Sequence, residues 1–158
     1  MTHREISAVL VGCGGISRTW LKALGEMHGE VSFKAFVDVR EEAARARAEE
    51  FGLAGLPTTT QVGDALDRYQ PEVVFDCTVP ESHYAVTMAA LARGCHVLGE
   101  KPLADTLEHA RAMVAAAEAA GRSYAVIQNR RYMPDIRRLR RLLVSGAIGR
   151  VTTVNSDF

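Results

Sequence analysis

The 158-residue sequence lacks an excess of charge of either sign. Its 19 lysine and arginine residues balance 19 aspartate and glutamate residues, so the formal net charge is zero. A chain without net charge creates no bulk electrostatic field that would attract nucleic acid or a membrane surface. Several arginines do gather between residues 130 and 141, but most of them share a helical segment with an apolar stripe. We interpret them as a solvated or interface surface rather than a nucleic-acid site.

Cysteine is scarce, and long hydrophobic runs are missing. The three cysteines, Cys13, Cys77 and Cys95, are odd in number and lie in apolar or strand-like contexts. This usage suits reduced thiols in a cytosolic protein better than a disulfide framework. The longest apolar run near the N-terminus, residues 6–11, carries a serine and is too short for a signal sequence or a membrane span. We therefore predict a cytoplasmic protein that does not bind membranes. No spacing of histidine, cysteine and acidic residues indicates a metal site.

The sequence does contain a regular alternation of short apolar runs and helix-period segments. The runs that we expect to form strands are residues 6–11, 31–39, 73–77, 95–99 and 124–128. The segments that we expect to form helices are residues 16–27, 41–50, 62–69, 82–93 and a last one that starts at a capping box of Asp105 and Glu108 and stops at Gly121. Strands separated by such helices imply right-handed crossovers. The pattern predicts an α/β fold with a doubly wound parallel sheet of the Rossmann type.

The first strand leads directly into a glycine cluster. Gly12 would permit a tight turn, and Gly14 would let the backbone approach a phosphate without a side chain. The helix that follows would offer free N–H groups and the positive end of its dipole. Asp38 closes the next strand, where a carboxylate could accept hydrogen bonds from the adenosine ribose. This arrangement predicts a dinucleotide site. NAD is favoured because Asp38 would repel a 2′-phosphate, while Arg40 keeps NADP as an alternative because a guanidinium can hold that phosphate.

A second cluster surrounds Lys101, which follows the strand expected at residues 95–99. Ligands of open parallel sheets bind beyond the carboxyl ends of the strands, so Lys101 would emerge beside the cofactor. There it could donate to a substrate oxygen and stabilise the charge that develops during hydride transfer, while Glu100 could orient it. For an isolated Glu-Lys-Pro the more ordinary interpretation is a loop lysine paired with a neighbouring glutamate. A cis bond before Pro102 is compatible with this block.

A third cluster lies in the loop after residues 73–77, at the same edge of the sheet. We expect Thr78 and Pro80 to shape the wall on the nicotinamide side. His83 could take part in proton transfer or could cap and pack the helix that it begins. The capping or packing role is favoured, because no nearby acidic residue looks placed to set the tautomer of His83.

Together these pieces resemble the glucose–fructose oxidoreductase, inositol dehydrogenase and MocA (Gfo/Idh/MocA) family of nicotinamide-dependent oxidoreductases. The resemblance covers nearly the whole chain, and the blocks that carry it are Val11-Gly12-Cys13-Gly14-Gly15-Ile16-Ser17, Val37-Asp38, Thr78-Val79-Pro80-Glu81-Ser82-His83, Ala90 to Ala104, Gln128-Asn129-Arg130-Arg131-Tyr132, and Gly146 to Val151. The Glu100-Lys101-Pro102 block in that setting is specific, so the catalytic interpretation of the lysine prevails over the ordinary one.

The resemblance implies that Gly12, Gly14 and Ile16 line the phosphate turn, that Asp38 binds the ribose, and that Glu100 and Lys101 lie by the nicotinamide. The other residues that we expect to bind the cofactor are Gly15, Arg40, Thr78, Pro80 and His83. Lys101 is also expected to assist catalysis. Two departures stand out. Ser17 replaces the glycine or alanine of the fingerprint, which should loosen the packing of helix on strand. Thr78 is separated from Pro80 by one residue, where the family places a threonine or serine directly before the proline.

After residue 128 the pattern changes. Residues 129–134 look like a linker, residues 135–144 like a helix, and residues 151–154 like the opening of a β-rich stretch. We expect residues 1–128 to form the dinucleotide-binding domain. Residues 129–158 would be a linker helix and the first strand of a truncated α+β substrate domain, because a strand without a partner suggests the front part of a longer protein. By resemblance, that domain would supply the substrate contacts and a histidine or aspartate that works with Lys101.

The leading functional interpretation is an NAD(P)-dependent dehydrogenase. It would move a hydride between the nicotinamide and a secondary alcohol carbon of a sugar, cyclitol or related polyol, and these 158 residues alone would be inactive. The alternatives are a non-redox enzyme with tightly bound NAD, which this family also includes, and a nucleotide-binding sensor without turnover. A sensor would not need a proton-handling lysine at the nicotinamide end. In full-length form we expect a homo-oligomer.

Overall fold

The computed structural model describes residues 4–27 and 29–155. The chain forms two compact units, and the boundary between them in the sequence falls between Ile127 and Gln128. The first unit contains six strands, all parallel, in the order β3-β2-β1-β4-β5-β6. Their bounds are β1 Ile6–Val11, β2 Val31–Val37, β3 Thr58–Thr59, β4 Val73–Asp76, β5 His96–Gly99 and β6 Tyr124–Val126. This is the doubly wound Rossmann order, in which the chain reverses its direction of progress at the boundary between β1 and β4. The predicted fold class is confirmed.

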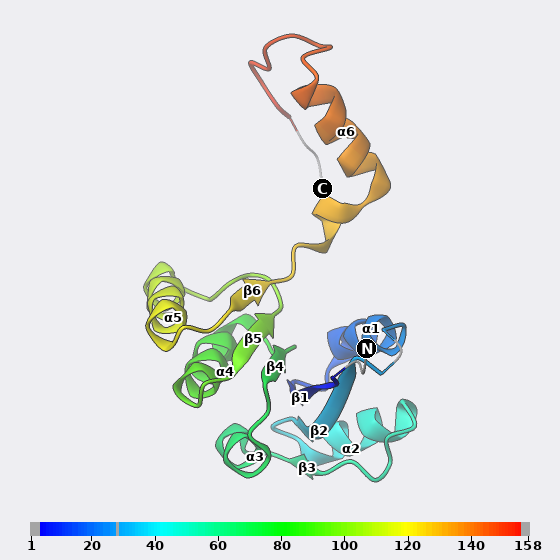
Figure 1. Ribbon diagram of the computed structural model, residues 1–158, viewed down its shortest axis with the longest axis vertical. Coiled ribbons are helices and arrows are strands. Elements are labelled where there is room, and N and C mark those ends of the chain that lie inside the picture. The colour runs from blue at the N-terminus through cyan, green and yellow to red at the C-terminus, as the bar shows by residue number, and fades with distance from the viewer. Residues whose placement is uncertain (1–3, 28, 156–158) are drawn as a thin grey trace. The chain divides into compact units, whose positions relative to one another are not determined.

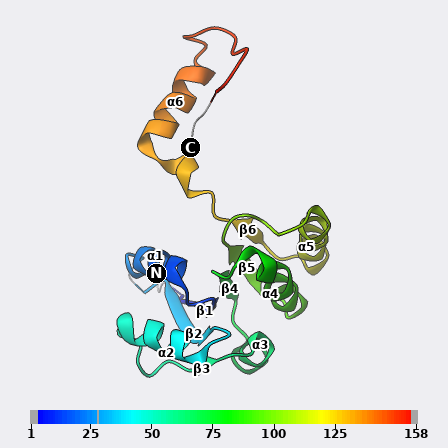
Figure 2. The ribbon, with the colours of Figure 1, turned by 180° about the vertical axis from the view of Figure 1, so that it is seen from behind.

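Helices cover both faces of the sheet. They are α1 Gly15–Gly25, α2 Glu41–Glu50, α3 Val62–Tyr69, α4 Pro80–Ala92 and α5 Leu107–Ala120. Alternate residues of β1 enter two separate cores. Leu10 packs in the core that α1 and α2 cover, whereas Val9 packs in the one that α3, α4 and α5 cover. Figures 1 and 2 show these two layers on opposite sides of the strands. Burial on both faces explains why the central strands read as continuous apolar runs.

Most expected elements appear within a residue or two of their predicted ends, with two differences. Strand β3 was not expected, because two threonines are too short to produce a period-2 pattern. The start of α5 was assigned to the wrong residue. Its N-cap is Thr106, whose Oγ1 accepts from the N–H of His109 at 3.1 Å, while Asp105 binds the His109 ring instead. Gly121 ends α5 in the left-handed conformation, with φ of 60°, as predicted.

The second unit contains a short 3₁₀ helix, η1 Asn129–Tyr132, and the helix α6 Pro134–Val144. The segment expected to be a linker is therefore partly helical. Residues 151–154 were expected to form a strand, and that expectation is wrong, since they carry no strand structure. A strand needs a partner for its ladder of hydrogen bonds, and none of the described segments pairs with residues 151–155. No helix in the described parts of the chain is long and apolar enough to cross a membrane.

Candidate functional site

The turn after β1 is built around Gly12, which has a φ of +88°. Its N–H donates to the carbonyl of Val37 at 2.8 Å, which ties the turn to the end of β2. A Cβ at this position would lie 2.6 Å from the carbonyl carbon of Cys77 and 2.7 Å from the nitrogen of Thr78, which are backbone atoms. Only glycine satisfies both the positive φ and this close approach. Gly12 therefore lets β1 and β4 come together at the point where the strand order reverses.

The next glycine faces open space. Gly14 has an ordinary φ of −72°, and, apart from its own residue, its chain neighbours and the backbone of its own helix, no heavy atom of the described residues lies within 4 Å of where its Cβ would be. It is the N-cap of α1, which begins at Gly15 and has no acidic residue in its first turn. Among the described residues no side chain caps this end of the helix, whose first N–H groups carry the positive end of the helix dipole. A phosphate could approach this surface closely. Ile16 is exposed beside it.

Ser17, at the third position of the fingerprint, does not loosen the packing as expected. Its side chain is completely buried, and its Oγ donates to the carbonyl of Gly14 at 2.7 Å. A small hydroxyl can be buried here because it is hydrogen-bonded within its own turn. The departure from the family pattern thus preserves the close contact between α1 and the sheet.

Asp38 follows β2 and is half-buried beside the turn. Its Oδ2 accepts from the N–H of Cys13 at 2.8 Å, and its Oδ1 accepts from the N–H of Arg40 at 3.0 Å. Each oxygen keeps lone-pair capacity for further donors such as ribose hydroxyls. The Arg40 residue is exposed. Burial and the neighbouring Asp38 charge raise the pKa of the Cys13 thiol to about 12, so this cysteine is not a nucleophile at neutral pH.

A cavity of about 390 Å³ lies at the carboxyl ends of β1, β2 and β4, where the strand order reverses. It is lined by residues of the turn after β1, the turn after β2 and the start of α4, among them Gly12, Gly14, Asp38, Thr78, Val79 and Ser82. Open parallel sheets bind their ligands at this place. Four of the residues predicted from sequence therefore meet in one cavity. A second cavity, of about 430 Å³, lies at the opposite edge of the sheet and contains none of them.

The loop after β4 holds a buried polar group that the sequence interpretation missed. His83 is 2% exposed, and its Nδ1 lies 3.0 Å from Oδ2 of Asp76, the last residue of β4. The expectation that no acidic residue sets the tautomer of His83 is therefore wrong. Thr78 completes the group, since its Oγ1 donates to Oδ1 of Asp76 at 2.5 Å. These bonds fix the loop that lines the cavity, while Pro80 occupies the first turn of α4.

Glu100 and Lys101 follow β5, outside the cavity described above. Glu100 is 8% exposed; its Oε1 accepts from the indole N–H of Trp20 at 2.7 Å, and its Oε2 accepts from the backbone N–H of Lys101 at 3.1 Å. The carboxylate therefore holds the main chain of Lys101 rather than its ammonium. The peptide bond between Lys101 and Pro102 is cis. Among residues 4–27 and 29–155, no carboxylate forms an ion pair with Lys101, whose residue is exposed.

Three residues that hydrogen-bond to predicted site residues were not predicted from the sequence: Trp20, Asp76 and Arg47. Trp20 binds Glu100, Asp76 binds His83, and Arg47 binds the carbonyl of Gly14. Asp76 had a signal that could have been used, because a carboxylate at the end of an otherwise apolar strand needs a buried partner. Trp20 lies in the helix expected at residues 16–27, and nothing in that pattern marks its indole as a hydrogen-bond donor to Glu100. Arg47 lies in an alanine-rich segment whose pattern predicts nothing beyond a helix. Among the described residues, no group of three or more potential metal ligands comes together.

Comparison with known proteins gives consistent matches. The family model described as an oxidoreductase family with an NAD-binding Rossmann fold matches residues 6–128. D-apiose dehydrogenase of Paraburkholderia graminis is 35% identical over 148 residues, which are 94% of this chain and 39% of that protein. D-glucoside 3-dehydrogenase of Escherichia coli is 30% identical over 151 residues, 96% of this chain and 42% of that protein.

Among solved structures, the WlbA dehydrogenase of Chromobacterium violaceum, in complex with NADH and UDP-GlcNAcA, matches with a TM-score of 0.87 and 27% identity. The match covers 95% of this chain and 43% of that one. The chain thus spans about two fifths of the length of the proteins that it matches.

Proposed function

Because this chain belongs to the Gfo/Idh/MocA oxidoreductase family and contains its NAD-binding Rossmann domain, we propose that the whole protein is a dehydrogenase of sugars, cyclitols or related polyols. The relatives named as D-apiose and D-glucoside dehydrogenases support this substrate class. The observation that carries the proposal is the cavity at the strand-order reversal. There the uncapped start of α1 and the Asp38 carboxylate face the same space.

The described residues fit a bound dinucleotide. The N–H groups of Gly14, Gly15 and Ile16 would bind the pyrophosphate, because no side chain in the described part of the protein caps this end of α1 or fills the space above Gly14. Asp38 would accept from the ribose hydroxyls, and the cavity would hold the adenosine. NAD, when bound, would supply the nicotinamide carbon that accepts or donates the hydride. Arg40 provides an exposed cation for a 2′-phosphate, so NADP is the alternative cofactor.

Lys101 would act on the substrate oxygen. Its ammonium is free of ion pairs among the described residues, and Glu100 fixes its main chain from the buried side. In the direction of alcohol oxidation its ammonium would donate to the substrate oxygen and stabilise the negative charge that develops there, while the hydroxyl proton would pass to the histidine or aspartate expected in the substrate domain. Thr78 and His83 would support the wall of the site through their hydrogen bonds to Asp76 rather than by direct proton transfer, and Pro80 would support it from the first turn of α4.

We further propose that residues 129–158 lead into a substrate-binding domain. Exposed apolar side chains on α6, including Ile136 and Leu139, support this, as does the greater length of the matched relatives. A homo-oligomer in full-length form belongs to the same proposal. A cytoplasmic location is supported by the three cysteines, all of which are free and buried.

The test is calorimetry of the 158-residue chain with NAD and NADP, together with a dehydrogenase assay on a panel of polyols. We expect binding, with NAD tighter, but no measurable turnover, because substrate positioning supplies roughly 7–11 kcal/mol of barrier reduction. Robust turnover by these residues alone would show that the active site ends earlier than proposed. NAD that survives purification of the whole protein would favour a non-redox enzyme. Binding without turnover in the whole protein would favour a sensor.

A further inference from the structure

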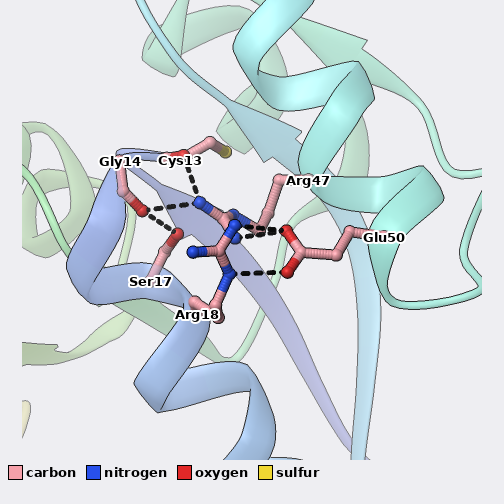
Figure 3. A network of polar contacts seen from close by, with 6 residues as sticks. All are labelled: Cys13, Gly14, Ser17, Arg18, Arg47 and Glu50. Carbon is pink, nitrogen blue, oxygen red and sulfur yellow. Dashed lines mark hydrogen bonds and ion pairs between the residues drawn. The ribbon is translucent and has the colours of Figure 1, made fainter.

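Arg47, on helix α2, donates hydrogen bonds to two carbonyl groups of the turn after β1, which is called the glycine turn below. Arg47 lies on α2, and its side chain is only 8% exposed. Its Nη2 donates to the carbonyl of Gly14 at 2.9 Å and to that of Cys13 at 3.2 Å, while its Nη1 donates to Glu50 at 2.5 Å. Figure 3 shows the guanidinium between the turn and the Glu50 carboxylate. The guanidinium therefore lies on the α2 side of the turn and binds its carbonyl groups.

The Glu50 carboxylate holds Arg47 in place from the side away from the turn. Glu50 also binds Arg18 of α1, with its oxygens 2.5 Å from Nε and 3.1 Å from Nη2 of that arginine. Hydrogen bonding from Arg18 lowers the pKa of the Glu50 carboxyl below its ordinary value, so Glu50 is ionised at neutral pH. The Arg18–Glu50–Arg47 chain links α1 to α2 across the turn (Figure 3). Because Nη1 of Arg47 is bound to Glu50 and Nη2 to the two carbonyls, the guanidinium can hold the turn in one orientation.

The orientation of the carbonyls determines the direction of the N–H groups. In a planar trans peptide the C=O and the N–H point in opposite directions. The carbonyl of Cys13 shares its peptide with the N–H of Gly14, and the carbonyl of Gly14 shares its peptide with the N–H of Gly15. Holding both carbonyls toward α2 therefore turns both N–H groups away from α2. These are the donors proposed above for the pyrophosphate.

We propose that Arg47 is a positioning residue that orients the glycine turn for the diphosphate of the dinucleotide. This inference rests on the proposed function. Arg47 contacts no ligand itself; it acts through the two peptide groups that it holds. Since those donors are fixed before the ligand arrives, binding does not have to order them, and this preorganisation strengthens the interaction with the phosphates. The adenosine end of the ligand depends on Asp38 and the cavity and should be nearly independent of Arg47.

The experiment compares adenosine, which lacks phosphates, with ADP, which carries the diphosphate. The dissociation constants of both ligands are measured on the 158-residue chain. The dissociation constant of adenosine divided by that of ADP then gives the contribution of the phosphates to affinity. We expect Arg47→Met to reduce this ratio about tenfold, the scale of one hydrogen bond to a charged group. The matched control is Arg45→Met, since Arg45 lies on the same helix but is exposed and pairs with Glu41. It should leave the ratio unchanged.

The outcomes separate the two proposals. If the unchanged protein binds ADP no better than adenosine, the proposed dinucleotide site itself is wrong. A second outcome is that the unchanged protein binds ADP better, while Arg47→Met and Arg45→Met have the same ratio of dissociation constants and Arg47→Met differs only in a lower melting temperature. Arg47 would then only join two helices, and the inference would be overturned. Should the methionine variant fail to fold, Arg47→Lys replaces it. Lysine keeps the charge but not the planar fork, so a reduced ratio supports the inference and an unchanged one refutes it.

Discussion

Replacement of Gly12 by alanine tests the central geometric claim about the turn. The new methyl group would lie 2.6 Å from the carbonyl carbon of Cys77 and 2.7 Å from both its oxygen and the nitrogen of Thr78. All three are backbone atoms at the end of a central strand, so they cannot move aside as the tip of a flexible side chain could. Alanine would also have to adopt a φ of +88°. We therefore expect a severe loss of stability.

The magnitude follows from the two contributions. A non-glycine residue in a strained conformation costs about 1–3 kcal/mol. Overpacking of a tight site costs about 1–3 kcal/mol more. The sum is roughly 2–6 kcal/mol, against a total unfolding free energy of about 5–15 kcal/mol for a typical domain. Gly12→Ala should therefore lower the midpoint of urea unfolding strongly or prevent folding at 37 °C.

Gly14→Ala is the matched comparison. Its φ of −72° suits alanine, and the added carbon would meet no atom of another described residue within 4 Å beyond its chain neighbours and its own helix backbone. Reduced freedom of the unfolded chain should stabilise this variant by about 0.4–1 kcal/mol. Alanine is a poorer N-cap than glycine, which offsets that gain, so the urea midpoint should change little. Its affinity for NAD should nevertheless fall, because the methyl group occupies the space through which we expect the phosphates to approach. An unchanged urea midpoint in Gly12→Ala would refute the packing argument. Unchanged NAD affinity in a folded Gly14→Ala would refute the position of the phosphates.

Three further predictions concern other parts of the site. Asp38→Ala should weaken NAD binding and narrow the gap to NADP in a calorimetric titration, because it removes both the ribose acceptor and the charge that repels a 2′-phosphate; NADP binding that equals or exceeds NAD binding in the unchanged protein would contradict this. Lys101→Ala in the whole enzyme should lower kcat by a factor of about 10²–10⁴ with little change in cofactor affinity, and near-normal turnover would leave the lysine without a catalytic role. Because burial raises the pKa of Cys13 from 9.0 to about 12, the neutral thiol stabilises the fold below pH 9, and this contribution is lost as the pH rises toward 12. Urea midpoints should accordingly fall between pH 9 and 11, and less steeply in Cys13→Ala; equal slopes would contradict the assignment.

Much of the fold could be predicted because its determinants are local in the sequence. Apolar runs such as Ile6–Val11 and glycine stops such as Gly121 act within a few residues of themselves. The turn glycines and Asp38 were recognisable for the same reason, since each follows directly on a strand. Local signals failed where the element was too short, as in Thr58–Thr59. They also failed at residues 151–154, where β-branched residues that favour a strand have no pairing partner among the described segments.

The sequence by itself determined the alternation of strands and helices that predicts a doubly wound sheet, the place of the glycine turn and the identity of the lysine loop, because periodicity and turn chemistry are properties of neighbouring residues. Only the tertiary structure decided which polar groups meet. The Trp20 indole reaches Glu100 across 80 positions of sequence, and Arg47 reaches the carbonyl of Gly14 across 33. Such contacts depend on how the crossovers fold α1 and α2 onto one face of the sheet. Packing thus brings the Trp20 and Arg47 donors within reach of these acceptors, and the hydrogen bonds formed there avoid the cost of leaving those donors buried and unpaired.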